Sequence, residues 1–222
     1  MPTSRRIFLL VAFAVLALAF ALDRTVAAAL HGSWLAVNLK GSVAATILKL
    51  PGEFWVTAVA AAVAYFTHSS RWRASVLLLL AGIASGVNGL VKWCAGRLRP
   101  YTDPSAPGSL VPYNFHPFIN GVSGMTTKNL CFPSGHAALA FATAAMLAEL
   151  FPRWRWVFYT IASATAAERV AENAHYLSDS VAAAILGIVC AKVIYCIAAP
   201  RLLKTPRGFD ILIKTGTSID RI

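Results

Sequence analysis

The sequence predicts an all-α membrane protein, a bundle of about six transmembrane helices with one interfacial amphipathic helix. Hydrophobic residues make up 58% of the chain and charged residues only 13%, whereas a typical soluble domain has about a quarter charged residues. The hydrophobic residues gather in six runs separated by polar, basic segments. No internal repeat or low-complexity linker divides the chain, so we expect residues 1–222 to form a single membrane-embedded domain.

The six apolar runs account for the predicted transmembrane helices. They lie at approximately 7–22, 54–67, 74–93, 136–151, 156–171 and 180–199. Several are shorter than the roughly 20 residues that a helix needs to cross the hydrocarbon of a bilayer. Each can be lengthened through flanking small, aromatic and basic residues, because basic side chains extend towards the membrane surface.

The segment 27–50 predicts a different kind of helix. Its apolar residues recur at helical spacing but are interrupted by His31, Lys40 and Lys49, which is typical of a helix lying along the membrane surface. At the N-terminus, a basic pair followed by an apolar run also resembles a secretion signal. Five further runs and no clean small-residue cleavage site favour a first transmembrane helix instead.

The distribution of basic residues predicts the orientation. With six spans, both termini lie on one side, together with Arg5, Arg6, Arg71, Arg73, Arg153, Arg155, Arg201, Lys204, Arg207, Lys214 and Arg221. The positive-inside rule makes that side cytoplasmic, so residues 1–6 and the tail 200–222 are expected in the cytoplasm. The long segment 94–133 then lies on the outer, periplasmic face of a bacterial inner membrane. Basic residues on that face oppose the rule and need another function: Lys92, Arg97, Arg99, Lys128 and Arg169.

Charge and cysteine content narrow the possible partners. A net charge of +11 suits nucleic acid, anionic lipid or a phosphate-bearing substrate. The basic residues form no stripe with interleaved aromatics, so we expect membrane lipids and a lipid phosphate as partners, and no nucleic acid. The cysteines form no CxxC pair that would indicate zinc. A disulfide between Cys94 and Cys131, which bracket a polar segment, is an open alternative.

Two of three polar clusters on the outer side suit an anion site. In KWCAGRLRP, Lys92 and Arg99 are seven residues apart, so they share a face if the helix continues that far. In FPSGHA, Pro133 and Ser134 suit the start of a helix. The backbone amides that follow would be free to bind an anion.

The third cluster, ERVAENAHYLSD, adds a nucleophile. His175 and Asp179 are four residues apart, on one helical face if the segment is helical. If Asp179 accepts a hydrogen bond from Nδ1, the Nε2 lone pair of His175 is available for attack. His136 of the second cluster is available to protonate a leaving group. The remaining residues of the clusters supply positive charges, a hydroxyl and a backbone amide that together suit a phosphoryl group: Lys92, Arg99, Ser134, Gly135 and Arg169. No carboxylate cluster suggests Mg²⁺ or Ca²⁺, so we expect neither a metal nor a cofactor.

Together the clusters resemble the type 2 phosphatidic acid phosphatase family, which shares its site with vanadium haloperoxidases. The family pattern is Lys, six residues, Arg-Pro; then Pro-Ser-Gly-His; then Ser-Arg, five residues, His, three residues, Asp. The chain has these motifs in the same order, as Lys92 to Pro100, Pro133 to His136, and Arg169 to Asp179. The expected layout of six helices extends the resemblance over most of the chain.

The resemblance implies a role for each motif residue. His175 resembles the family's nucleophile, which forms a phosphohistidine, Asp179 its orienting partner and His136 its general acid. The implied phosphate ligands are Lys92, Arg99, Ser134, Gly135 and Arg169. One departure is Glu168, which stands where the family has Ser. Its carboxylate is placed to compete for the Arg169 guanidinium or to order it.

These inferences predict a metal-independent phosphatase acting on a lipid phosphate or diphosphate at the outer face of the membrane. Undecaprenyl diphosphate, a lipid A phosphate and a glycerolipid phosphate all offer the required group. A lipid-to-lipid phosphotransferase using the same histidine is one alternative. A transporter or channel is another, although the apolar runs carry few of the charges that mark ion paths. Arg97 is expected to be a membrane anchor or headgroup contact.

Overall fold

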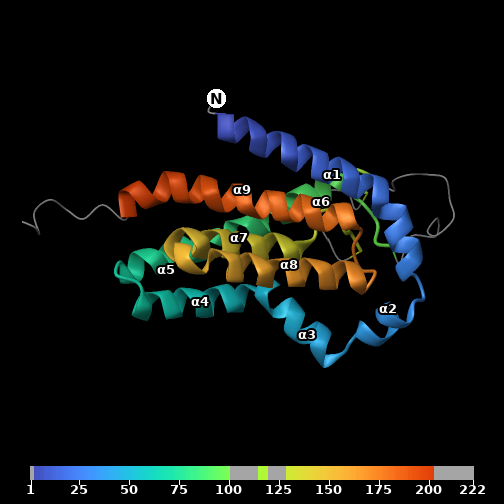
Figure 1. Ribbon diagram of the computed structural model, residues 1–222, viewed down its shortest axis with the longest axis horizontal. Helices are drawn as coiled ribbons and strands as arrows, with labels where there is room; N and C mark the ends of the chain where they lie inside the picture. The colour runs from blue at the N-terminus through green and yellow to red at the C-terminus, as the bar shows by residue number, and fades with distance from the viewer. Residues whose placement is uncertain (1–2, 101–114, 120–128, 203–222) are drawn as a thin grey trace, which may run out of the picture.

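The computed structural model describes residues 3–100, 115–119 and 129–202, and these form a bundle of helices (Figure 1). The α-helices are α1 (Thr3–Leu30), α2 (Trp34–Leu39), α3 (Val43–Lys49), α4 (Phe54–Thr67), α5 (Arg71–Ala81), α6 (Ile83–Ala95), α7 (Gly135–Leu150), α8 (Arg155–Ala171) and α9 (Leu177–Leu202). Two short 3₁₀ turns, η1 (Leu50–Gly52) and η2 (Pro152–Trp154), precede α4 and α8. The described residues contain no β-strand beyond two isolated bridges, so the all-α prediction is confirmed.

The predicted apolar runs largely coincide with these helices, but fewer than six stretches of the described residues qualify as membrane spans. Three stretches are long and apolar enough to cross a bilayer: Arg6–Leu30, Arg71–Ala95 and Leu177–Leu202. A fourth arises if Val43–Gly52 and Phe54–Thr67, which meet at a bend of 62°, are counted as one broken span. The total of six spans stays a prediction.

The segment 27–50 is not the single amphipathic helix that its spacing predicts. α1 continues to Leu30, and two short helices follow, separated by left-handed residues at Gly32 (φ 66°) and Gly41 (φ 76°). After each glycine a serine side chain caps the next helix: Ser33 accepts from the Ala36 amide and Ser42 from the Ala45 amide. Glycine adopts this backbone conformation at little cost and serine is a favoured cap, so local chemistry interrupts the helical periodicity.

Helix α7 lies at the centre of the bundle and packs against α5, α6, α8 and α9. Its buried face is rich in alanine, including Ala137, Ala138, Ala142 and Ala145, and small residues let helices approach closely within a membrane. The two helices approach closely at Gly187, where a Cβ atom would lie 2.3 Å from the Ala138 carbonyl oxygen. This close packing brings the first turns of α7 against α9.

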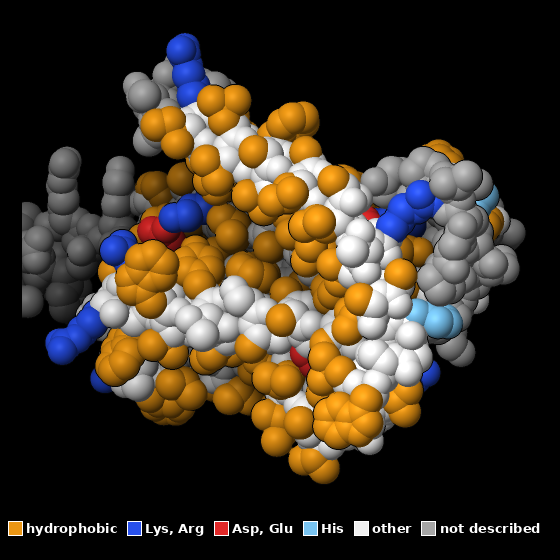
Figure 2. Space-filling model, turned by 45° about the vertical axis from the view of Figure 1, so that its right-hand side comes forward, with side chains coloured by type: hydrophobic (Ala, Val, Ile, Leu, Met, Phe, Trp, Pro, Cys, Tyr) orange, Lys and Arg blue, Asp and Glu red, His pale blue; other side chains and the backbone are white. Residues whose placement is uncertain are grey.

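The outer surface of the bundle is apolar. Figure 2 shows hydrophobic side chains over most of the visible face, with Lys and Arg side chains towards its edges. Large exposed hydrophobic side chains occur on most of the long helices, among them Phe13, Phe66, Leu90, Ile161 and Ile197. A water-soluble protein rarely exposes so much apolar surface, so this surface suits the hydrocarbon of a bilayer.

The three polar clusters meet at one end of the bundle, on the right in Figure 1, where α6 and α8 end and α7 and α9 begin. After α6 the chain turns at Gly96 (φ 64°), where a Cβ atom would lie 1.8 Å from the His116 carbonyl oxygen. Arg97 then pairs with Phe115 and Leu98 with Leu130 in isolated antiparallel bridges. This turn brings the first cluster beside the third.

Candidate active site

His175 and Asp179 form a buried pair at the centre of the site. His175 is 3% exposed, and its Nδ1 lies 3.5 Å from Asp179 Oδ2. The same carboxylate oxygen accepts the Tyr176 amide at 2.9 Å, and the other accepts Arg97 Nη1 at 2.6 Å. Because Asp179 faces Nδ1, Nε2 is the ring nitrogen left for a substrate.

Arg97 belongs to the site, so its assignment as a membrane anchor or headgroup contact is wrong. It is 1% exposed and joins two carboxylates, Asp179 at 2.6 Å and Asp23 at 2.9 Å. Burial alone would lower the pKa of the Arg97 guanidinium, but the two carboxylates raise it above its usual value. The wrong assignment arose because a basic residue next to an apolar run usually does reach the membrane surface.

Asp23 is a member of the site that the sequence analysis missed. It lies on α1 and is 1% exposed. Besides Arg97, it accepts the Ser178 amide at 2.8 Å and the Ser178 hydroxyl, so it holds the start of α9 against α1. An ionisable residue at the end of a long apolar run was the available signal, because such residues need a partner within the protein.

Lys92 and Arg99 both approach the nucleophile, although α6 ends at Ala95 and the two residues do not share a helical face. Lys92 is buried in the last turn of α6, and Arg99 Nη1 donates to the Ala174 carbonyl at 3.5 Å. Burial lowers the pKa of His175 to about 4; Asp179 opposes this change, and the charges of Lys92 and Arg99 add to it. His175 is therefore neutral near pH 7, with two cations beside it.

Ser134 and Gly135 form the start of α7. Ser134 is fully buried, its amide donates to the Asp179 carbonyl at 3.1 Å, and its hydroxyl has no partner among the described residues. The first hydrogen bond of the helix runs from Ala138 to the Ser134 carbonyl at 3.0 Å, so the amides between them precede the helical ladder. A buried free hydroxyl and helix N-terminal amides can together bind an anion.

His136 is the second residue of α7. Its imidazole contacts Glu53, whereas the imidazole of His175 faces Asp179. The Nε2 atom of His136 lies 3.1 Å from Glu53 Oε1, just before α4. The backbone at Gly52 lies so close to His136 that a Cβ atom on Gly52 would be 2.6 Å from the histidine Cβ. The sequence analysis missed Glu53, which is 83 residues away along the chain.

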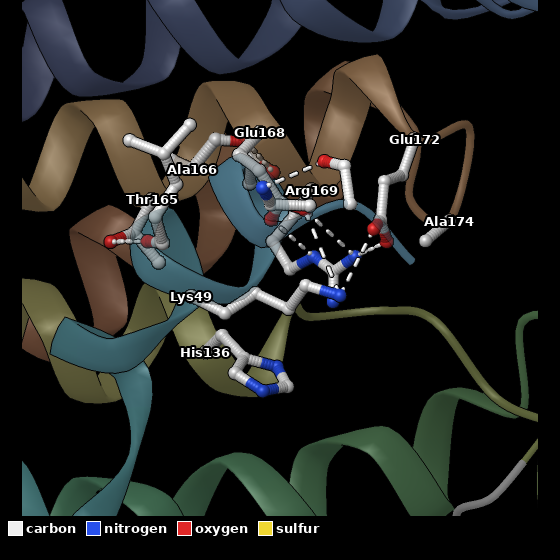
Figure 3. Close-up of polar contacts among 12 residues, drawn as sticks. Lys49, His136, Thr165, Ala166, Glu168, Arg169, Glu172 and Ala174 are labelled. Atoms are coloured by element: carbon white, nitrogen blue, oxygen red, sulfur yellow. Dashed lines mark hydrogen bonds and ion pairs between the residues drawn. The ribbon is translucent and has the colours of Figure 1, made fainter. Parts of the chain in front are cut away.

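Arg169 lies in a cluster of alternating charges. Figure 3 shows its guanidinium between Glu168 and Glu172, with Lys49 beside it and the His136 imidazole below. The Glu168 carboxylate lies 3.0 Å from Arg169 Nε, Glu172 pairs with its Nη2, and Lys49 Nζ lies 2.9 Å from Glu172. The expectation that Glu168 engages the guanidinium is confirmed.

The structure contains neither the disulfide considered from the sequence nor, among the described residues, a cluster of metal ligands. Cys94 and Cys131 are free thiols rather than a disulfide. Cys131 Sγ donates to the Leu98 carbonyl at 3.0 Å, and burial raises the pKa of this thiol. Within residues 3–100, 115–119 and 129–202, no group of three His, Cys, Asp or Glu side chains is arranged to hold a metal ion.

The comparison with protein families agrees with the motifs. The model of the PAP2 superfamily matches residues 72–202, more than half of the chain. The chain belongs to the PAP2 superfamily. The matched region contains all three motifs, from Lys92 to Asp179, and the resemblance drawn from the sequence is thereby confirmed.

Two similar proteins extend this result. A lipid A 1-phosphatase from Porphyromonas gingivalis is 29% identical over 152 residues, which cover 66% of this chain but only 28% of that protein. A crystal structure of the first transmembrane PAP2-type phosphatidylglycerolphosphate phosphatase, from Bacillus subtilis, has a similar fold, with a TM-score of 0.55 and 17% identity. That similarity covers 96% of this chain and 98% of the other, so the described helices of this PAP2 superfamily member have a known PAP2 transmembrane fold.

Proposed function

We propose that this PAP2 superfamily protein is a metal-independent lipid phosphate phosphatase that works through a phosphohistidine on His175. The observation that carries the proposal is the surroundings of His175. It is buried, Asp179 faces its Nδ1, and the cations Lys92 and Arg99 lie close enough to affect its pKa. An imidazole with a carboxylate at one nitrogen and cations beside the ring is suited to attack a phosphoryl group.

In the first step, His175 Nε2 attacks phosphorus while the bond from phosphorus to the lipid oxygen breaks. Protonated His136 gives its proton to that oxygen, so the lipid leaves as an alcohol, or as a lipid monophosphate when the substrate is a diphosphate. The cations hold the phosphoryl oxygens through the transition state: Lys92, Arg99 and Arg169. The Ser134 hydroxyl and the Gly135 amide complete the set of donors.

In the second step, water attacks phosphorus and the bond to Nε2 breaks. His136, now neutral, takes the proton from the attacking water, and inorganic phosphate leaves. Asp179 stabilises the positive charge that His175 carries while it is phosphorylated. Both histidines then return to their starting protonation states.

The proposed substrate is a lipid whose phosphate lies at the membrane surface. The apolar sides of the bundle would let lipid tails remain between or beside the helices while the headgroup enters the polar end. Lipid A 1-phosphate is the first substrate to test, because the relative from Porphyromonas gingivalis carries that activity in its name. Undecaprenyl diphosphate and phosphatidylglycerol phosphate offer the same reacting group.

The proposed location of the site is the outer face of a bacterial inner membrane, with cytoplasmic termini. The start of α1 and the end of α9 lie towards the opposite end of the bundle from the motif residues (Figure 1). This supports an even number of crossings, and the basic residues outside the spans then place the termini inside. Labelling of single cysteines introduced at residue 116 and at residue 153 in intact cells would test this orientation.

The test is a phosphate-release assay on detergent-purified protein in EDTA, with these three lipids and phosphatidic acid, against His175→Ala. Release that persists in EDTA and disappears in the variant supports the proposal. Release that is unchanged in His175→Ala contradicts it. Transfer of the phosphoryl group from one lipid to another, without free phosphate, would instead identify a phosphotransferase.

A further inference from the structure

We infer that Glu53 is a positioning residue that orients His136 and favours its protonated form, for transfer of its proton to the leaving lipid oxygen. The inference rests on the proposed function, because it assigns a partner to the general acid of that reaction. None of the three sequence motifs contains Glu53. Its position just before α4 brings a second carboxylate to a second histidine in the same site.

The first observation is the contact itself. Glu53 Oε1 lies 3.1 Å from His136 Nε2, and the two side chains are 45% and 32% exposed. A carboxylate at this distance favours the imidazolium form over the neutral ring. With Nε2 engaged, Nδ1 is the nitrogen available to a leaving group, and it makes no hydrogen bond within the described parts of the chain.

The second observation is independent and concerns the backbone. At Gly52 an added Cβ atom would lie 2.6 to 2.7 Å from the Cβ, Cα and carbonyl oxygen of His136. The turn η1 therefore lies directly against the first turn of α7. This close packing fixes the residue that follows Gly52, and so places the Glu53 carboxylate relative to the imidazole.

The charges around His136 explain why it needs such a partner. Burial is the largest influence that favours the neutral form of the ring, and the charges of Arg169 on α8 and Lys49 on α3, which lie near the ring, add to it, whereas Glu53 opposes it. Glu53 is the carboxylate in contact with the ring, and Glu168 and Glu172 are engaged with Arg169 and Lys49. Without Glu53, burial and the two cations would favour the neutral ring still more strongly, and the neutral ring cannot supply this proton.

The experiment compares two monoesters, octyl phosphate and p-nitrophenyl phosphate, by kcat/KM in the wild type and in Glu53→Gln. This parameter reports the steps up to transfer of the phosphoryl group to His175. An alkoxide needs protonation to leave, whereas p-nitrophenolate does not. We expect kcat/KM of Glu53→Gln to fall about 10- to 100-fold with octyl phosphate, within the usual contribution of a general acid, and less than about 3-fold with p-nitrophenyl phosphate.

Two further readouts separate positioning from a purely structural role. The alkaline limb of the kcat/KM profile for octyl phosphate should move to lower pH in Glu53→Gln, because the protonated imidazole loses its carboxylate. In a His136→Gln background, Glu53→Gln should cause no additional loss, because a residue that acts through His136 has no effect without it. Glu53→Asp should restore part of the selective loss.

The matched control is Glu149→Gln, which removes a partly exposed carboxylate that pairs with Lys192 away from the site; it should leave both substrates unaffected. Equal losses with both substrates, or an additive loss in the His136→Gln background, would overturn the inference. If Glu53→Gln fails to fold, the same comparison is made with Glu53→Asp. A wild type inactive on both esters, or an active His175→Ala, would instead refute the proposed function.

Discussion

The two histidines of the site are held in different ways. His175 is 3% exposed, and its carboxylate is fixed by Arg97, which in turn is bonded to Asp23 on α1. The His136 side chain is 32% exposed, and Glu53, its side-chain partner among the described residues, is 45% exposed. The nucleophile is thus held by a buried network that joins distant parts of the chain, whereas the acid is held by a single, more exposed contact.

This difference suits the proposed chemistry. A nucleophile that forms a covalent bond needs a fixed position and a fixed protonation state, and burial provides both. An acid that later becomes a base must change its protonation state in each cycle, and partial exposure makes that change less costly. The comparison therefore predicts that perturbing the His175 side affects stability as well as turnover, and that perturbing the His136 side affects mainly turnover.

The largest expected effect comes from removing the nucleophile. His175→Ala should reduce phosphate release by at least about 10³-fold, as removal of a covalent nucleophile does in other enzymes. The control is His31→Ala, which changes an exposed histidine after α1 and should keep normal turnover. Near-normal phosphate release by His175→Ala in the EDTA assay would show that His175 is not the nucleophile.

The next effect concerns the network behind the nucleophile. Arg97→Met leaves the Asp23 and Asp179 carboxylates buried without their shared cation, and breaking a buried ion pair in this way costs about 3–5 kcal/mol. Denaturation in detergent should show this loss, and adding Asp23→Asn should recover part of it. Arg201→Met, at the exposed end of α9, should change stability little. An Arg97→Met protein as stable as the wild type would show that the network is not what fixes the pair.

A third prediction uses pH. The pKa of His175 is lowered to about 4 in the folded protein, whereas an unfolded histidine titrates near 6.5. Between these values the unfolded chain binds a proton that the folded chain does not. Stability should therefore fall as the pH drops from about 6.5 to about 4, by up to about 3 kcal/mol. His175→Gln should lose less stability over the same range, and an identical loss would contradict this assignment.

The smallest effect is expected at Arg169, through the carboxylate of Glu168 that contacts it. Glu168→Ser restores the residue type of the family motif and removes one carboxylate from Arg169, which should strengthen binding of the phosphoryl group. We expect KM to fall roughly 2- to 5-fold, equivalent to about 0.5–1 kcal/mol, with little change in kcat. A rise in KM would indicate that Glu168 orders the guanidinium rather than competing with substrate.

The sequence predicted the helices and the motif residues well because both depend on short-range patterns. Apolar runs locate helices, and a separation of four residues keeps His175 close to Asp179, although His175 lies in the bend before α9 and not on a helical face as expected. The family resemblance then supplied the roles, and the family match confirms the membership on which those roles rest. The individual roles stay predictions until the variants are measured.

The residues that were missed pair across the fold. Arg97 and Asp23 are 74 positions apart, and Glu53 and His136 are 83 apart, so no local spacing connects them. The segment 27–50 was misjudged for the opposite reason, since glycine and serine at its breaks are local signals that outweighed the apolar periodicity. Buried charges next to apolar runs are therefore better treated as members of unknown pairs than as surface anchors.

The most direct test of the account is detection of the covalent intermediate. Purified protein is mixed with lipid A 1-phosphate, quenched in alkali, where phosphohistidine is stable, and analysed by peptide mass spectrometry. The account predicts a phosphoryl group on His175, present in the wild type and absent from His175→Ala. Turnover without modification of His175, or a phosphoryl group on another residue, would contradict the central claim.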